Sequence, residues 1–190
     1  MYKRQRTTFR FDTEIFKDDV DFKFETLAQR FREMAFVTRK VEIRLVDERG
    51  DKEMAFFFEG GIRSFVRYLN RNRVALHPVF YAEKEVDNIG IEVAVQFTDA
   101  YNESVYSFTN TINTVDGGTH MTGLRMALTR VINDYARKTS LLKDADPNFT
   151  GDDTREGMTA IVAIKHPDPQ FESCLLYTSD AADDLLCVGL

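Results

Sequence analysis

The segment 119–139 narrows the possible folds further than any other part of the sequence. Its apolar residues recur at spacings of three and four, which predicts one long helix with an apolar stripe made of Leu124, Ala127, Leu128, Val131, Ile132 and Tyr135. Arg130, Asn133 and Arg137 fall on the opposite face, and Arg125 falls at the boundary. Because a helix with such a stripe must bury it against another layer, the chain needs a partner sheet or helix.

Strand patterns on both sides of that segment can supply the layer. Alternation is clearest in 41–46, 91–97 and 158–165, and further strands are expected at 7–11, 54–58, 79–86 and 105–112. Residues 49–51 provide a turn that makes a hairpin of the strands at 41–46 and 54–58. Helical spacing recurs at 22–36, with Leu27, Phe31 and Met34 on one stripe, and at 62–69. This mixture predicts an α/β layer domain.

Charge and hydropathy exclude some classes of protein. The net charge is −6, from 25 basic and 31 acidic side chains, which weakens a prediction of nucleic-acid binding. It does not exclude such binding, because the electrostatic field depends on local arrangement. The sequence contains no apolar run of about 18 residues and no apolar signal-peptide core, so we expect no membrane segment and a cytoplasmic location.

Both ends of the sequence resemble translations of a transposase-type sequencing adapter. The match covers 1–5 and the segment that begins Cys-Leu-Leu-Tyr-Thr-Ser at 174. We therefore expect 1–5 and 173–190 to be adapter-derived and base no expected element on them. Both cysteines, Cys174 and Cys187, lie in the second of these segments, so the remaining chain has no thiol for a disulfide, a nucleophile or a metal.

The usual catalytic patterns are missing from the sequence. It has no Gly-x-Gly-x-x-Gly loop after a strand, no phosphate-loop lysine motif and no Gly-x-Ser-x-Gly elbow. The three histidines, His77, His120 and His166, lack the spacing of metal ligands. We therefore predict no catalytic residues and no metal site in this chain.

The residues at 109–120 carry the main functional signal. They read Thr-Asn-Thr-Ile-Asn-Thr-Val-Asp-Gly-Gly-Thr-His, and this stretch resembles a signature of the gyrase B family, the ATP-hydrolysing subunits of type IIA DNA topoisomerases. The resemblance continues at 56–61, 65–70, 123–125, 128–130, 152–157 and 162–171. Leu124 departs from the family, which usually has Phe at that position.

This resemblance implies a transducer domain at 21–172, preceded at 6–20 by the end of an ATPase domain and its connection. The implied fold is an α+β two-layer sandwich similar to the second domain of ribosomal protein S5, with a left-handed crossover that departs from the usual rule. In the family, a Gln-Thr-Lys motif follows Phe171-Glu172, and its lysine reaches the γ-phosphate of ATP. That lysine is absent from this chain, and the family's ATP- and Mg²⁺-binding residues lie upstream.

The implied function is to couple ATP binding and hydrolysis to clamp closure and DNA strand passage. The implied partners are double-stranded DNA, the gyrase A protein and a second copy of gyrase B, with ATP and Mg²⁺ bound by the full-length parent. The fragment alone is expected to be inactive. Two alternatives stay open: the topoisomerase IV counterpart of gyrase B, and a free-standing S5-like α/β module that binds nucleic acid or protein without an ATPase role.

Two groups of residues are candidates for the site. Arg125, Arg130 and Arg137 could hold DNA phosphates by charge, or they could pair with nearby carboxylates. Asn113, Gly117, Gly118, Thr119 and His120 belong to the family motif and are expected to be structural. In that motif the two glycines would form a turn, and the hydroxyl of Thr119 could cap the helix.

Overall fold

The computed structural model describes residues 7–12, 14–15, 21–143, 145–172 and 175–177. The elements follow one another as α1 (Phe24–Val37), β1 (Ile43–Asp47), β2 (Lys52–Phe56), α2 (Ile62–Leu69), β3 (Phe80–Val86), β4 (Ile89–Phe97), β5 (Ser104–Thr109), β6 (Ile112–Asn113), α3 (Thr119–Lys138), β7 (Met158–Lys165), β8 (Gln170–Glu172) and β9 (Leu175–Tyr177). The predicted α/β class is confirmed.

A five-stranded sheet organises the molecule, with the strand order β3-β4-β7-β5-β6. Its pairs are antiparallel except for β5 and β7, which are parallel neighbours. Parallel neighbours need a long crossover connection, and here the chain between β5 and β7 contains β6 and α3. The helix predicted from residues 119–139 is therefore the crossover helix of the sheet.

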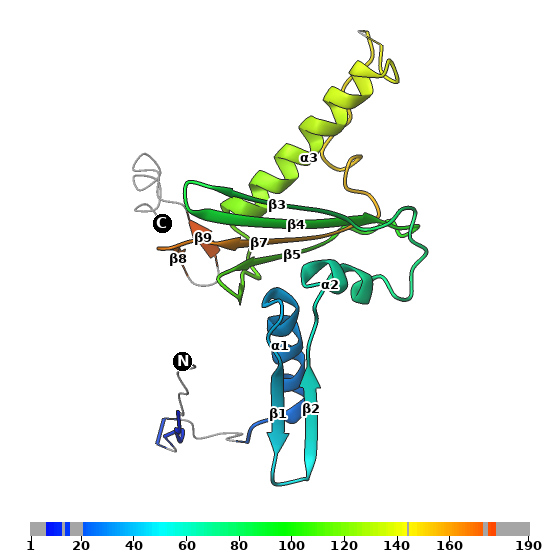
Figure 1. The fold of residues 1–190 in the computed structure, drawn as a ribbon. Helices are drawn as coiled ribbons and strands as arrows, with labels where there is room; N and C mark the ends of the chain where they lie inside the picture. Colours follow the sequence, from blue (N-terminus) through cyan, green and yellow to red (C-terminus); the bar gives the residue numbers. More distant parts are fainter. Residues whose placement is uncertain (1–6, 13, 16–20, 144, 173–174, 178–190) are drawn as a thin grey trace.

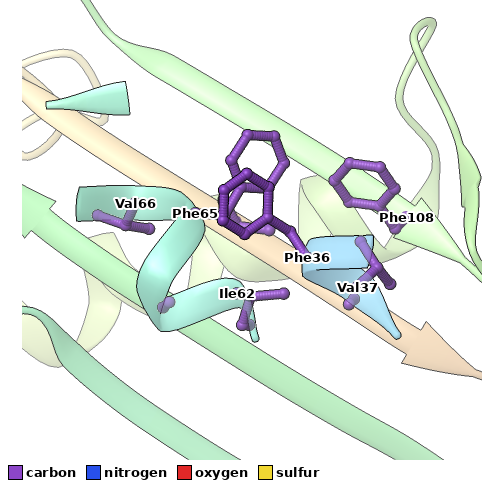
Figure 2. Packing of buried hydrophobic residues seen from close by; sticks show 9 residues of the cluster. Phe36, Val37, Ile62, Phe65, Val66 and Phe108 are labelled. Atoms are coloured by element: carbon purple, nitrogen blue, oxygen red, sulfur yellow. The ribbon is translucent and has the colours of Figure 1, made fainter. Parts of the chain in front are cut away.

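Helices lie on both faces of this sheet (Figure 1). On one face, Leu124 and Leu128 of α3 pack on strand residues that include Val95 and Met158. On the other face, α1 and α2 bury a cluster that Figure 2 shows: Phe36, Val37, Ile62, Phe65 and Val66, packed against Ala94, Phe108, Ile161 and Ala163 of the sheet. The ring of Phe36 stacks on those of Phe58 and Phe65.

The strand β7 is buried on both sides because it lies between the two helical layers. Its residues from Met158 to Ile164 are all buried, and only Lys165 at its end is exposed. The strand predicted at 158–165 is therefore present, but its side chains do not alternate between the core and solvent, because both faces of the strand are covered. Small residues, Ala160 and Ala163, fit where the layers approach this central strand.

The hairpin β1–β2 extends away from the large sheet with α1 beside it (Figure 1). Phe24, Ala28 and Ala35 of α1 pack with Leu45 and Phe56 in this separate small core. Of the stripe predicted for this helix, Leu27 and Phe31 pack against this core, whereas Met34 is exposed. The hairpin therefore contacts the helix through part of the predicted stripe together with the two buried alanines.

Two of the predicted strands differ from the structure. Residues 7–11 form no strand. The predicted strand 105–112 is a hairpin, because the chain reverses at Asn110 and Thr111, whose φ angles are 47° and 74°. Positive φ at both central residues is the geometry of a tight two-residue hairpin turn. Asn110 fixes this turn by donating to the His166 carbonyl at 2.7 Å and accepting from its N–H at 2.9 Å.

The second half of α3 projects past the edge of the sheet (Figure 1). The apolar stripe is therefore only partly buried: Leu124 and Leu128 pack on strands, whereas Val131 and Tyr135 are 62% and 63% exposed. The chain at 149–154 lies along a different face of this half and contacts Thr129 and Asn133. In this half of α3, Asn133 of the predicted polar face is thus buried while Val131 and Tyr135 of the apolar stripe are exposed.

Candidate nucleic-acid interface

The glycine pair forms the turn that leads into α3. Gly117 and Gly118 have φ angles of 91° and 143°, a region that L side chains rarely adopt. A Cβ on Gly117 would lie 3.3 Å from the terminal methyl of Met121, so the side chain of Met121 closes the turn. Gly118, which has no side chain, is the N-cap residue of α3, and Thr119 is the first residue of the helix.

His120 is held inside this turn. Its Nε2 lies 3.0 Å from the hydroxyl of Thr114, and Thr114 is itself paired with Ser107 at the β5–β6 hairpin. Burial lowers the pKa of His120 to about 4. The imidazole is therefore neutral near pH 7 and offers no positive charge to a phosphate. Asn113 ends β6 opposite Phe108, which also fits a structural part for this motif.

Arg125 forms an ion pair with Glu103, which precedes β5. The Nε of Arg125 donates to Glu103 Oε1 at 3.0 Å, and the two side chains are 39% and 26% exposed. Among the residues that the structure describes, no partner is found for the two terminal nitrogens of Arg125. The guanidinium is thus held from one side and keeps donors for a further acceptor.

Glu103 also pairs with a second arginine, which the sequence patterns did not indicate as part of the site. The Nε of Arg155 lies 3.4 Å from Glu103 Oε1, and its Nη2 lies 2.9 Å from Asp152 Oδ1. One oxygen of Glu103 is thus shared between α3 and the loop before β7. The residues involved are 22 and 52 positions from Glu103, and no local pattern could have predicted the pair.

Arg130 and Arg137 have different environments. Arg130 is 83% exposed and lies 3.7 Å from Asp134, a loose pair one helical turn away that contributes little to stability. Arg137 binds the following loop: its nitrogens donate to the carbonyls of Lys143 and Asp146 and to Asn148 Oδ1, at 2.6–3.0 Å. The three predicted arginines are therefore not equivalent, and Arg137 already has acceptors.

Acidic side chains surround the Glu103 pair. A hollow of about 330 Å³ beside it is lined by Tyr101, Glu103, Asp152, Asp153, Arg155 and Glu156. Across the described ranges, no three His, Cys, Asp or Glu side chains come together as a metal site. Nor do the Gly117–Gly118 turn and its neutral histidine fit a nucleotide phosphate, because Met121 fills the turn. None of the helices in the described part could span a membrane.

Comparison with known proteins connects this arrangement to one family. A family model described as DNA gyrase B matches residues 61–174. The gyrase B protein of Bacillus mycoides is 52% identical over 169 residues, which cover 87% of this chain and 42% of that protein. The crystal structure of the 43K ATPase domain of Thermus thermophilus gyrase B superimposes with a TM-score of 0.74 at 35% identity, covering 87% of this chain and 45% of that one.

A more distant neighbour is the topoisomerase IV ATP-binding domain of Francisella tularensis, with a TM-score of 0.70 and 21% identity over 90% of this chain and 49% of that one. That likeness shows the fold alone. The chain spans less than half the length of each of these relatives. Since the gyrase B model covers more than half of the residues, the chain belongs to the DNA gyrase B family.

Proposed function

We propose that residues 21–172 are the transducer part of an ATP-dependent type II DNA topoisomerase of the gyrase B type. The observation that carries this proposal is the match to gyrase B relatives across the whole domain, at 52% identity over 169 residues. In this proposal the domain couples ATP binding and hydrolysis elsewhere in the full-length protein to clamp closure and strand passage. ATP, Mg²⁺, the gyrase A protein and a second copy of gyrase B belong to that parent, which is cytoplasmic.

The DNA contact is assigned to two arginines of α3, Arg125 and Arg130. Arg125 keeps two terminal nitrogens without a partner in the described part of the chain, and Arg130 is 83% exposed. A guanidinium with free donors can hold a phosphate by charge and hydrogen bonds without reading the base sequence. Arg137 is the weakest of the three candidates, because a phosphate would have to compete with four hydrogen bonds to the loop.

The near alternative is the topoisomerase IV counterpart of gyrase B, since a topoisomerase IV ATP-binding domain has the same fold. The match to the DNA gyrase B family model and the 52% identity to a gyrase B relative favour gyrase. A free-standing α/β module without an ATPase role is the alternative from another class, and extending the source DNA sequence beyond both ends tests it. A Gln-Thr-Lys motif after Glu172 and an upstream ATPase domain support the topoisomerase.

A chimera tests the coupling function. Residues 21–172 replace the corresponding segment in the longer gyrase B protein of Clostridium acetobutylicum, which is 50% identical over 166 residues, and ATP-dependent supercoiling is measured with the matching gyrase A protein. We expect retained supercoiling, because the two segments share about half of their residues. A folded chimera that hydrolyses ATP but moves no DNA would contradict the proposal.

Titration of the 190-residue chain with double-stranded DNA tests the contact itself. Arg125→Gln should reduce the slope of log K against log salt by about one, as expected for the loss of one phosphate contact. Arg44→Gln is the matched control, because Arg44 is also paired with a glutamate, Glu53, but lies on the remote β1–β2 hairpin. Equal slopes for Arg125→Gln and the unmodified chain would contradict the contact.

A further inference from the structure

We propose that Glu103 is the counter-charge that limits how tightly Arg125 holds a DNA phosphate. This inference rests on the proposed contact between Arg125 and DNA and adds to it a residue that tunes the contact. It starts from the geometry of the ion pair, in which Glu103 Oε1 accepts from the Nε of Arg125 at 3.0 Å. Glu103 is thus a positioning residue that does not itself contact DNA.

Glu103 binds the guanidinium of Arg125 from one side. Contact through Nε leaves the two terminal nitrogens of Arg125 for a phosphate, so the ion pair and the DNA contact can exist together. In this proposal the negative charge of Glu103 stays within a few ångströms of the guanidinium both in the free protein and when Arg125 binds a phosphate. Because Coulomb energy falls only as the inverse of distance, an approaching phosphate experiences both charges.

The surroundings of the ion pair are acidic. The hollow next to Arg125 is lined by four carboxylates, Glu103, Asp152, Asp153 and Glu156, and by one guanidinium, that of Arg155. With Arg125, which pairs with Glu103, the region holds four carboxylates and two guanidinium groups, so its net charge is −2. A duplex that approaches Arg125 therefore meets repulsion from Glu103, which orders the arginine, and from the carboxylates of the loop before β7. Such a site holds a backbone weakly, which suits DNA that must be released after passage.

Two substitutions of Glu103 separate its charge from its orienting effect. Glu103→Gln removes the charge but retains a carbonyl oxygen that can accept from the Nε of Arg125. Glu103→Ala removes both. If Glu103 limits affinity through its charge, both variants bind DNA more tightly. If Glu103 only orients Arg125, the Gln variant binds like the unmodified chain and the Ala variant binds more weakly.

The experiment is a fluorescence-anisotropy titration of the 190-residue chain against a short labelled duplex at several salt concentrations. We expect Glu103→Gln to raise the affinity about two- to five-fold at low salt, a change typical of a partly exposed ion pair. The gain should shrink as salt rises, because salt screens exposed charges. In an Arg125→Gln background the same substitution should have less than about half of this effect.

A matched control accounts for the change in net charge. Glu53→Gln also removes one negative charge from an arginine pair, on the β1–β2 hairpin, and should leave DNA affinity unchanged. Thermal unfolding of each variant shows whether the fold is retained. An equal gain for Glu53→Gln and Glu103→Gln would overturn the inference, because the effect would then follow net charge and not position.

The two proposals fail in different ways. If Arg125→Gln weakens DNA binding while Glu103→Gln leaves it unchanged or lowers it, the inference is overturned and the DNA contact stands. If Arg125→Gln has no effect on binding, the DNA contact itself is overturned, and the inference falls with it. Tighter binding by Glu103→Gln that depends on Arg125 supports both.

Discussion

The side-chain amide of Asn133 on α3 pairs in both directions with the backbone of Phe149. Its Oδ1 accepts from the Phe149 N–H at 2.8 Å, and its Nδ2 donates to the Phe149 carbonyl at 3.0 Å. Nδ2 also donates to the Thr129 carbonyl at 2.9 Å, and the residue is buried. One asparagine therefore joins the loop before β7 to the part of α3 that extends past the sheet.

Asn133→Ala should lower the free energy of unfolding by about 2–3 kcal/mol, because it leaves both backbone groups of Phe149 without these partners in a partly buried place. Chemical denaturation measures the change. Asp134→Ala is the control: this neighbour is exposed and only loosely paired, and we expect a change within about 0.5 kcal/mol. Equal effects of the two substitutions would show that the pair with Phe149 does not anchor the loop.

His120 should make stability depend on pH. Its folded pKa of about 4 lies below the ordinary value of 6.5, so the unfolded chain binds the proton more readily. The stabilisation is fully present above the unfolded pKa and is lost as pH falls toward 4. Because the ring is only partly buried and solvent screens it, we expect the free energy of unfolding to decrease by about 1 kcal/mol between about pH 7 and pH 5 because of this residue.

Comparison with His120→Gln isolates this contribution, since the other titrating groups stay in both proteins. Denaturant unfolding at the same two pH values gives the difference. The variant should be less stable at neutral pH, through the loss of packing, and should change less between the two pH values. A parallel pH dependence of the two proteins would mean that His120 is not held neutral by burial.

Gly157 should tolerate no side chain. It has a φ of 69°, and a Cβ there would lie 2.5 Å from the carbonyl oxygen of Thr98 and 2.6 Å from that of Ala100. Because these are backbone atoms, they cannot move as a flexible side chain could. Gly157→Ala should cost more than about 3 kcal/mol.

Gly123 provides the matched glycine for this test. It lies on α3 with open space around the position of a Cβ, so Gly123→Ala should stabilise the protein by about 0.5–1 kcal/mol through helix propensity. Melting temperatures of the two variants should shift in opposite directions. A small loss for Gly157→Ala would mean that the turn before β7 can adjust.

Lys40 is a candidate for stabilisation by glycine. It has a φ of 65° in the turn after α1, a region that is unfavourable for a long side chain. Lys40→Gly should raise the free energy of unfolding by about 0.5–1 kcal/mol, since the relief of strain exceeds the added entropy of the unfolded chain. Asp51→Gly, at a φ of 49°, should gain less, because aspartate tolerates this region better. The reverse order in denaturant midpoints would contradict this explanation.

Local periodicity was enough to predict the positions of most helices and strands. The helix at 62–69, the strands at 79–86 and 91–97 and the long helix after Gly117-Gly118 all follow from it, because a side chain's direction in a helix or strand depends only on local spacing. The motif at 109–120 also indicated the family that the comparison with known proteins shows.

Positions 1–5, predicted to be adapter-derived, lie outside the described residues. Within 173–190 only Leu175–Tyr177 are described, paired with β8, and the adapter origin of both ends stays a prediction.

Burial and pairing, by contrast, became known only from the tertiary packing. Local spacing placed Asn133 on a polar face, yet the loop at Phe149 covers it, and that loop is 16 residues away. The same spacing could not separate Arg137, which binds the following loop, from Arg125, which shares Glu103 with Arg155. Such contacts depend on where the loops that follow and precede the helices and strands lie in space. Periodicity within one element carries no information about the course of those loops, because it reports only the direction of side chains along that element.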